Sequence, residues 1–169
     1  MESARDMFRE LMSAIHSDNV EHACNILNNH HAEFDSHKLT LALLRATERT
    51  HVDITKILLS FGANPNGFLD QVPLAHAVRV DEEDLDLVKC LALVKCLLEA
   101  GANPEQQDEN TYTALMYAVS NHYNDIAKAL IEAGASMESE TYDGDTAIDM
   151  ATRAGNIYIL EYIQNLNRA

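Results

Sequence analysis

Large aliphatic residues and alanines recur along the 169-residue chain in one register. In five segments an aliphatic residue stands three positions before an alanine, a spacing that places both on one face of a helix. A small residue that returns at the same place implies close packing of helices there. The pattern therefore predicts five helices, with the pairs Leu11 and Ala14, Leu43 and Ala46, Leu74 and Ala77, Leu115 and Ala118, and Ile148 and Ala151.

A second apolar cluster follows each of these helices, and three of the clusters end in a glycine phrase. Glycine just after a periodic apolar run is typical of a helix C-cap. Asn-Pro, which follows two of the glycine phrases, blocks continuation of the helix. Each unit therefore reads as helix, turn, helix, glycine cap and extended turn. The clusters are Ile26-Leu27, Leu58-Leu59, Leu97-Leu98, Leu130-Ile131 and Tyr162-Ile163, and the phrases are Gly62-Ala63-Asn64-Pro65, Gly101-Ala102-Asn103-Pro104 and Gly134-Ala135-Ser136.

The best-matching units start at Thr113 and Thr146, 33 residues apart. Their openings, the Val72-Pro73-Leu74 opening and the glycine endings resemble the ankyrin repeat. The resemblance implies an all-α ankyrin repeat solenoid of about five helix-turn-helix repeats with short β-hairpin-like loops. We expect one domain, 1–169, because the first and last repeats turn polar as capping repeats do. Its repeats would span about 5–35, 36–66, 67–107, 108–140 and 141–169.

The third repeat carries eight extra residues within Val80 to Val94, including the tandem hexads of 87–98. The acidic lead Asp81-Glu82-Glu83-Asp84 suits a helix N-terminus. We therefore expect the second helix of this repeat to be about two turns longer than its counterparts. One interpretation is an apolar ledge for a partner; the other, which we favour, is a duplication tolerated on the convex surface. The apolar side chains that share one face of this helix, and would form the ledge, are Leu87, Leu91, Val94 and Leu98.

The formal net charge is −15, from 27 acidic and 12 basic residues. Such a chain has no electrostatic reason to approach nucleic acid or anionic lipid. Its charge indicates either a partner with a basic patch or a solvated acidic surface and nothing more, since charge alone does not name a partner. Three cysteines without disulfide spacing indicate a reducing compartment. No signal peptide or membrane-length apolar run is present in the sequence. We expect a cytoplasmic, intracellular protein that is monomeric on its own.

Motifs for chemistry are missing from the sequence. Phosphate-binding glycine loops, zinc-protease, hydrolase and kinase signatures do not occur. The eight histidines lack ligand spacing, so we expect no metal site and no cofactor. Asp143-Gly144-Asp145 lacks the further ligands of a calcium loop. The sequence therefore predicts a protein without enzymatic activity.

The resemblance implies that a partner protein binds the concave face, built from hairpin tips and first helices. Exposed aromatic residues at such tips are typical interface anchors, and two adjacent large apolar residues at one tip cannot both be buried there. Packing against the neighbouring hairpin is the alternative for the two tyrosines. The predicted partner-binding residues are His37, Lys38, Phe68, Leu69, Gln71, Arg79, Glu109, Asn110, Tyr112, Ser120, Asn121, Tyr142, Asp143 and Asp145, with Glu48, Arg49 and Arg153 on the first helices.

The leading hypothesis is thus a non-enzymatic protein–protein interaction module: an adaptor, an inhibitor or a subunit of a complex. The alternative within the binding class is a bacterial effector, secreted without a classical signal peptide, or an immunity-type protein that binds its target. The sequence carries no address that decides between them. An enzyme is the third hypothesis, and it would need a polar cleft with convergent titratable groups.

Overall fold

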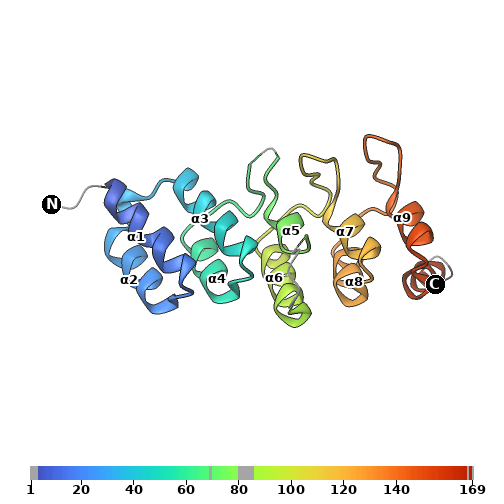
Figure 1. Ribbon diagram of the computed structural model, residues 1–169, viewed down its shortest axis with the longest axis horizontal. Coiled ribbons are helices and arrows are strands. Elements are labelled where there is room, and N and C mark those ends of the chain that lie inside the picture. The colour runs from blue at the N-terminus through green and yellow to red at the C-terminus, as the bar shows by residue number, and fades with distance from the viewer. Residues whose placement is uncertain (1–3, 69, 80–85, 167, 169) are drawn as a thin grey trace.

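The helices of the chain stand in pairs, one beside the next, in a single row (Figure 1). The structure is a computed structural model that describes residues 4–68, 70–79, 86–166 and 168. Helices with odd labels contact one another along the row, and so do those with even labels. The pairs are α1 (Ala4–His16) and α2 (Val20–His30), α3 (Ser36–Glu48) and α4 (Val52–Ser60), α5 (Pro73–His76) and α6 (Leu87–Glu99), α7 (Ala114–Ser120) and α8 (Asn124–Glu132), and α9 (Ala147–Ala154) and α10 (Ile157–Leu166).

The predicted aliphatic and alanine positions form the core between the pairs. Leu11, Leu43, Leu74 and Leu115 are at most 1% exposed, and the five alanines of the register are buried with them. Burial of one leucine side chain stabilises the fold by about 1.5–3 kcal/mol. Ile148 differs, because 37% of its surface stays exposed at the last pair. The core is therefore one continuous layer that each pair shares with its neighbours, as the repeat pattern predicts.

Glycine ends the second helix of three pairs, as predicted. Gly62, Gly101 and Gly134 adopt φ values of 92°, 89° and 94°. Side chains with a Cβ rarely take this left-handed conformation. After each glycine, the next N–H reaches back to the helix; that of Ala102 donates to the Leu97 carbonyl at 2.9 Å. The turn closes the helix and redirects the chain toward the next repeat.

Three loops project on one side of the row, before α5, α7 and α9 (Figure 1). They are the predicted hairpins. In the loop before α7 the Asp108 N–H donates to the Tyr112 carbonyl at 3.0 Å, and in the loop before α9 Glu140 and Thr146 form an antiparallel bridge. The stretch before α3 is instead a 3₁₀ turn, η1 (His31–Glu33). The first two pairs are thus joined without a hairpin.

The third pair is irregular, but less so than predicted. α6 has 13 residues, whereas α4 and α8 have nine each. The extension is therefore four residues, about one turn rather than two. α6 begins after Asp86, whose carboxylate caps it, and the acidic lead 81–84 lies outside the described residues. The insertion thus lengthens the helix by only half of its residues.

Candidate partner-binding site

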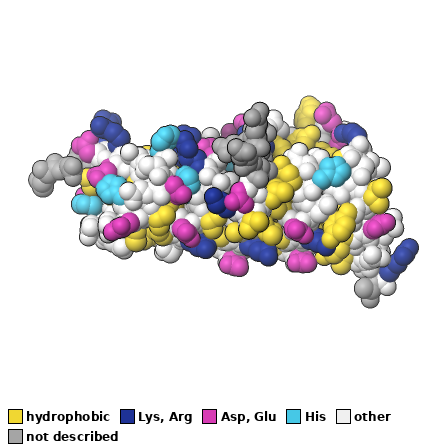
Figure 2. Space-filling view, turned by 60° about the horizontal axis from the view of Figure 1, so that its bottom comes forward, with side chains coloured by type: hydrophobic (Ala, Val, Ile, Leu, Met, Phe, Trp, Pro, Cys, Tyr) yellow, Lys and Arg dark blue, Asp and Glu magenta, His cyan; other side chains and the backbone are white. Residues whose placement is uncertain are grey.

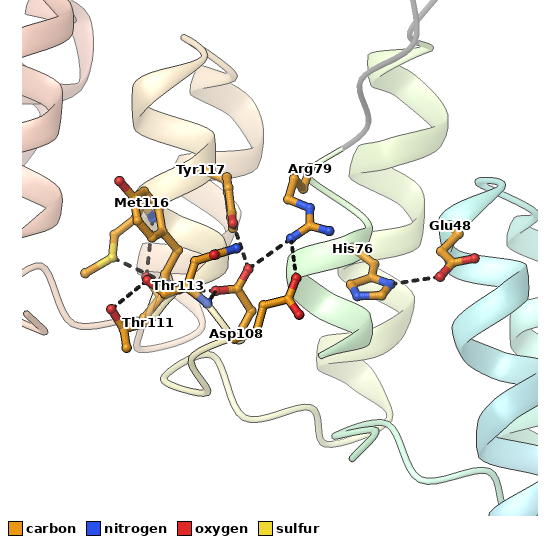
Figure 3. A network of polar contacts seen from close by, with 11 residues as sticks. Glu48, His76, Arg79, Asp108, Thr111, Thr113, Met116 and Tyr117 are labelled. Atoms are coloured by element: carbon orange, nitrogen blue, oxygen red, sulfur yellow. Dashed lines mark hydrogen bonds and ion pairs between the residues drawn. The ribbon is translucent and has the colours of Figure 1, made fainter. Parts of the chain in front are cut away.

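Asp108 anchors the hairpin before α7 through hydrogen bonds to its side chain. Its side chain is only 2% exposed, yet four donors reach it (Figure 3). Oδ1 accepts the N–H groups of Asn110 at 2.9 Å and Tyr112 at 3.1 Å. Oδ2 accepts the Tyr117 hydroxyl at 2.7 Å and Arg79 Nη1 at 3.4 Å. A buried carboxylate persists only where its lone pairs are satisfied, so the hairpin is held in one conformation.

Arg79 joins the third repeat to the fourth. Its Nη1 atom lies 3.4 Å from Asp108 and 3.6 Å from the Glu109 carboxylate, and 35% of the side chain stays exposed. Burial, followed by the hydrogen bond with Asp108, raises the pKa of Tyr117, so its phenol keeps its proton at neutral pH. Arg79 and Glu109, both predicted as binding residues, are therefore partly engaged with each other. Either can still be contacted from outside, because neither is buried.

We call the first helix of each pair (α1, α3, α5, α7 and α9) an inner helix. His76 and Glu48 form the next polar pair along the inner helices (Figure 3). His76 Nδ1 lies 3.6 Å from Glu48 Oε1, beyond hydrogen-bond distance, and this buried nitrogen has no hydrogen-bond partner among the described residues. Burial lowers the pKa of His76 more than the neighbouring Glu48 raises it. The imidazole is thus neutral near pH 7, and it belongs to the packing between α3 and α5.

The two tyrosines at the hairpin tips have different surroundings. The Tyr112 ring packs on Tyr117 of α7, with 5.1 Å between ring centroids, so it contacts a helix of its own repeat rather than the neighbouring hairpin. Tyr142 is 92% exposed. Its backbone N–H donates to Thr111 Oγ1 at 2.7 Å, which ties its hairpin to the preceding one. Tyr142 is therefore a free aromatic side chain on a fixed backbone.

The second repeat has no hairpin tip where the sequence predicts one. His37 and Lys38 lie in the first turn of α3, because no hairpin precedes this helix. The His37 ring packs on the half-buried Phe68, with centroids 4.8 Å apart, and Lys38 Nζ donates to the Glu33 carbonyl at 2.9 Å. Phe68 therefore contacts the neighbouring repeat, against the expectation of a free anchor. Leu69 lies outside the described residues.

The remaining predicted residues are spread over both ends of the inner helices. Asn110, Asp143 and the half-buried Asp145 belong to the hairpins, and Arg153 binds the Asp145 carboxylate through two hydrogen bonds of 2.9 and 2.7 Å. Gln71 is exposed just before α5. Ser120 and Asn121 stand at the opposite end of α7. Arg49, at the C-cap of α3, contacts the first repeat, because its Nη2 lies 2.8 Å from His16 Nδ1.

A hollow of about 220 Å³ opens between α1, α3 and the stretch before α5, and the sequence reasoning missed it. Apolar side chains of α1 and α3 outside the core column line it together with three polar side chains, those of Arg45, Glu48 and Gln71. The available signal was an excess of apolar residues on the first helices beyond the leucine and alanine positions. The apolar lining consists of Phe8, Met12, Leu41 and Leu44.

In residues 4–68, 70–79, 86–166 and 168, no group of three His, Cys, Asp or Glu side chains could hold a metal ion. Within the same residues, none of the helices is long and apolar enough to cross a membrane. What the inner helices and hairpins offer is a row of fixed polar and aromatic groups beside an apolar hollow. Stacked helix pairs with such a surface define a helical repeat protein.

Comparisons with known proteins identify the repeat. The family described as "Ankyrin repeats (3 copies)" matches residues 87–168. Protein fem-1 homolog A of Bos taurus is 31% identical over 102 residues, which are 59% of this chain and 16% of that protein. Protein phosphatase 1 regulatory subunit 27 of Mus musculus is 42% identical over 60 residues, 36% of this chain and 39% of that protein. Ankyrin repeat and SOCS box protein 6 of Homo sapiens is 29% identical over 111 residues, 62% of this chain and 25% of that protein.

The chain matches the ankyrin repeat family over residues 87–168, which together with its relatives supports an ankyrin repeat protein of the protein-interaction class. It spans less than two-fifths of the length of each of these three relatives. Similarity therefore covers the repeats and not the remainder of those proteins. The surface that distinguishes this chain has to be found in its own side chains.

Proposed function

We propose that this chain holds a partner protein against its inner helices and hairpin tips, and that the partner contributes a basic segment. The observation that carries the proposal is Tyr142, a 92% exposed aromatic side chain whose backbone is tied to Thr111. An exposed tyrosine on a fixed backbone loses little conformational entropy on binding, which makes it a favourable interface anchor.

The charges around Tyr142 support a basic partner. Residues 133–149 contain five carboxylates and no lysine or arginine. Asp145 is neutralised by Arg153, and Asp149 caps α9. The three other carboxylates, those of Glu138, Glu140 and Asp143, have no ion pair within the described residues. An arginine of the partner could stack on the tyrosine ring while it faces these acids. Such attraction raises the association rate and weakens with salt.

The apolar hollow beside Phe8 and Leu41 would take a side chain of the same partner. It lies on the same inner helices, toward the first repeats. A partner that spans the row would thus meet an apolar contact at one end and an acidic, aromatic contact at the other. The role is that of an adaptor, an inhibitor or a subunit of a complex. The name of one relative, protein phosphatase 1 regulatory subunit 27, describes that protein as a regulatory subunit. A bacterial effector or immunity-type protein would use the same surface.

The test begins with affinity capture from the native source, followed by titration calorimetry of the purified partner. Tyr142→Ala is expected to weaken binding about tenfold or more, as truncation of an interface anchor does. Tyr158→Ala is the matched control, because this 49% exposed tyrosine lies on α10, away from the hairpins. Affinity should also fall as salt rises. Equal affinity of both variants and the original chain would contradict the proposed site.

A further inference from the structure

The first turn of α6 presents apolar side chains that the core does not use. Leu87 is 45% exposed and Val88 is 78% exposed. The buried residues of this helix follow one stripe, which begins at Cys90 and continues through Leu93, Val94 and Leu97. Leu87 and Val88 precede that stripe. They belong to the four residues by which α6 exceeds α4 and α8.

A groove runs between this turn and the start of α8. Leu87, Val88 and Leu91 line one wall, and Tyr123 and Ile126 line the other, around a volume of about 290 Å³. We call these five residues the α6 groove. Figure 2 shows that hydrophobic side chains gather in the middle part of the face in view. Apolar surface that is exposed around a groove is typical of a protein contact.

The α6 groove is distinct from the hairpin surface. It opens beside the turn that follows α7, whereas the hairpin with Asp108 precedes α7. The two surfaces thus lie at opposite ends of a seven-residue helix, which is about 10 Å long. A ligand in the groove would not need to touch Tyr142 or its neighbours. The two contacts can therefore be tested separately.

The groove carries negative charge. Asp125 is exposed in its lining, and the described lining contains neither lysine nor arginine. Asp86 caps α6 at its edge, and its only described ion pair is a 3.8 Å contact with Lys89. Four more acidic residues, 81–84, precede Asp86 in the sequence. In the sequence, residues 81–89 contain five carboxylates and one lysine, so the charge of this segment complements a basic ligand.

We propose that the α6 groove is a second docking surface, which takes a partner segment with an aliphatic side chain next to a lysine or arginine. The aliphatic side chain lies against Leu87, Leu91 and Ile126, and the cation faces Asp125. A second copy of this chain fits poorly, because two chains of formal charge −15 repel each other. The insertion in the third repeat then supplies one wall of a binding groove.

The experiment titrates the full, isotope-labelled chain with a short helical peptide of leucines and lysines, and follows backbone amide shifts. A second peptide has glutamate in place of lysine. The lysine peptide is expected to shift the amides of Leu91, Asp125 and Ile126 in a saturable manner, and the glutamate peptide is not. The proposal is overturned if neither peptide shifts them or if both do so equally.

Two variants and their controls locate the contact. Leu87→Ser should weaken the lysine peptide about tenfold, through lost apolar burial. Its control is Ile157→Ser, at a 66% exposed isoleucine on α10. Asp125→Asn should weaken binding about threefold at low salt, with Glu21→Gln, at an exposed carboxylate on α2, as its control. Unchanged binding in Leu87→Ser overturns the groove. A loss in Asp143→Asn or Tyr142→Ala instead overturns it in favour of the hairpin surface.

Discussion

Asn66 Oδ1 accepts the backbone N–H of Asn103 at 2.7 Å, across the boundary between the second and third repeats' closing turns. The same bond occurs at three places, always to the residue two positions after the capping glycine. Thr40 Oγ1 accepts from Asn64 at 2.9 Å, and Glu105 Oε1 accepts from Ser136 at 2.5 Å. Asn66 and Glu105 thus fix the backbone of the next repeat, whereas Thr40 and Asn64 belong to the same repeat. We call these three hydrogen bonds the ladder. They hold the closing turns in place in addition to the apolar packing of the helices.

Asn66→Ala tests the ladder. The substitution leaves the Asn103 N–H without its acceptor, so we expect the free energy of unfolding to fall by about 1 kcal/mol. Urea denaturation at pH 7 measures the change. Asn165→Ala is the control, because the Asn165 side chain has no described hydrogen bond and is exposed. Equal losses in both variants would show that the ladder contributes nothing specific.

Thr50→Gly tests a strained turn between α3 and α4. Thr50 has φ of 55°, in the left-handed region that a β-branched residue rarely adopts. Glycine removes the strain but costs backbone entropy, so we expect a net gain of up to about 1 kcal/mol. Thermal unfolding measures it. His122→Gly is the comparison at the equivalent turn, with φ of 59°, and should gain less, since histidine tolerates this region better. A loss of stability in Thr50→Gly would contradict the strain.

The sequence predicts the stack well because its signals are local and repeated. Leu43 and Ala46, or Gly101 and Ala102, recur at the same register, and each occupies the predicted place. The length of α6 is predicted poorly. An insertion can be counted in the sequence, but how many of its residues join a helix depends on the packing of neighbours. The packing of Phe68 on His37 is also a contact between repeats, which no local pattern encodes.

Asp108→Ala tests the anchor of the hairpin before α7, in the fourth repeat. Removal of the carboxylate leaves the Tyr117 hydroxyl, two backbone N–H groups and part of the Arg79 guanidinium without their acceptor. We expect the free energy of unfolding to fall by about 2–4 kcal/mol, because buried donors without partners are costly. Asp143→Ala, at an exposed tip, should stay within about 0.5 kcal/mol. Chemical denaturation measures the free energy of unfolding of both variants. Equal losses in Asp108→Ala and Asp143→Ala would contradict the anchoring role of Asp108.

Two half-buried histidines, His51 and His76, make stability depend on pH. Burial lowers the pKa of His76 and of His51 below the ordinary value of 6.5. The unfolded chain therefore binds more protons than the folded chain once the pH falls below about 6.5. By linkage, the free energy of unfolding decreases as the pH falls through this range, by at most about 1.4 kcal/mol per pH unit for each proton. Glu48, Asp108 and Glu109 counteract the effect at His76, whereas Arg79 adds to it.

His76→Gln removes one of these titrating groups while it keeps a polar side chain of similar length. We expect its free energy of unfolding to change less between pH 7.5 and pH 5.5 than that of the original chain, since fewer protons are taken up on unfolding. His51→Gln should reduce the dependence in the same way, and the double variant should reduce it further. Urea denaturation at both pH values gives the comparison. If the dependence on pH is the same with and without His76, its folded-state pKa is not lowered and the burial argument fails.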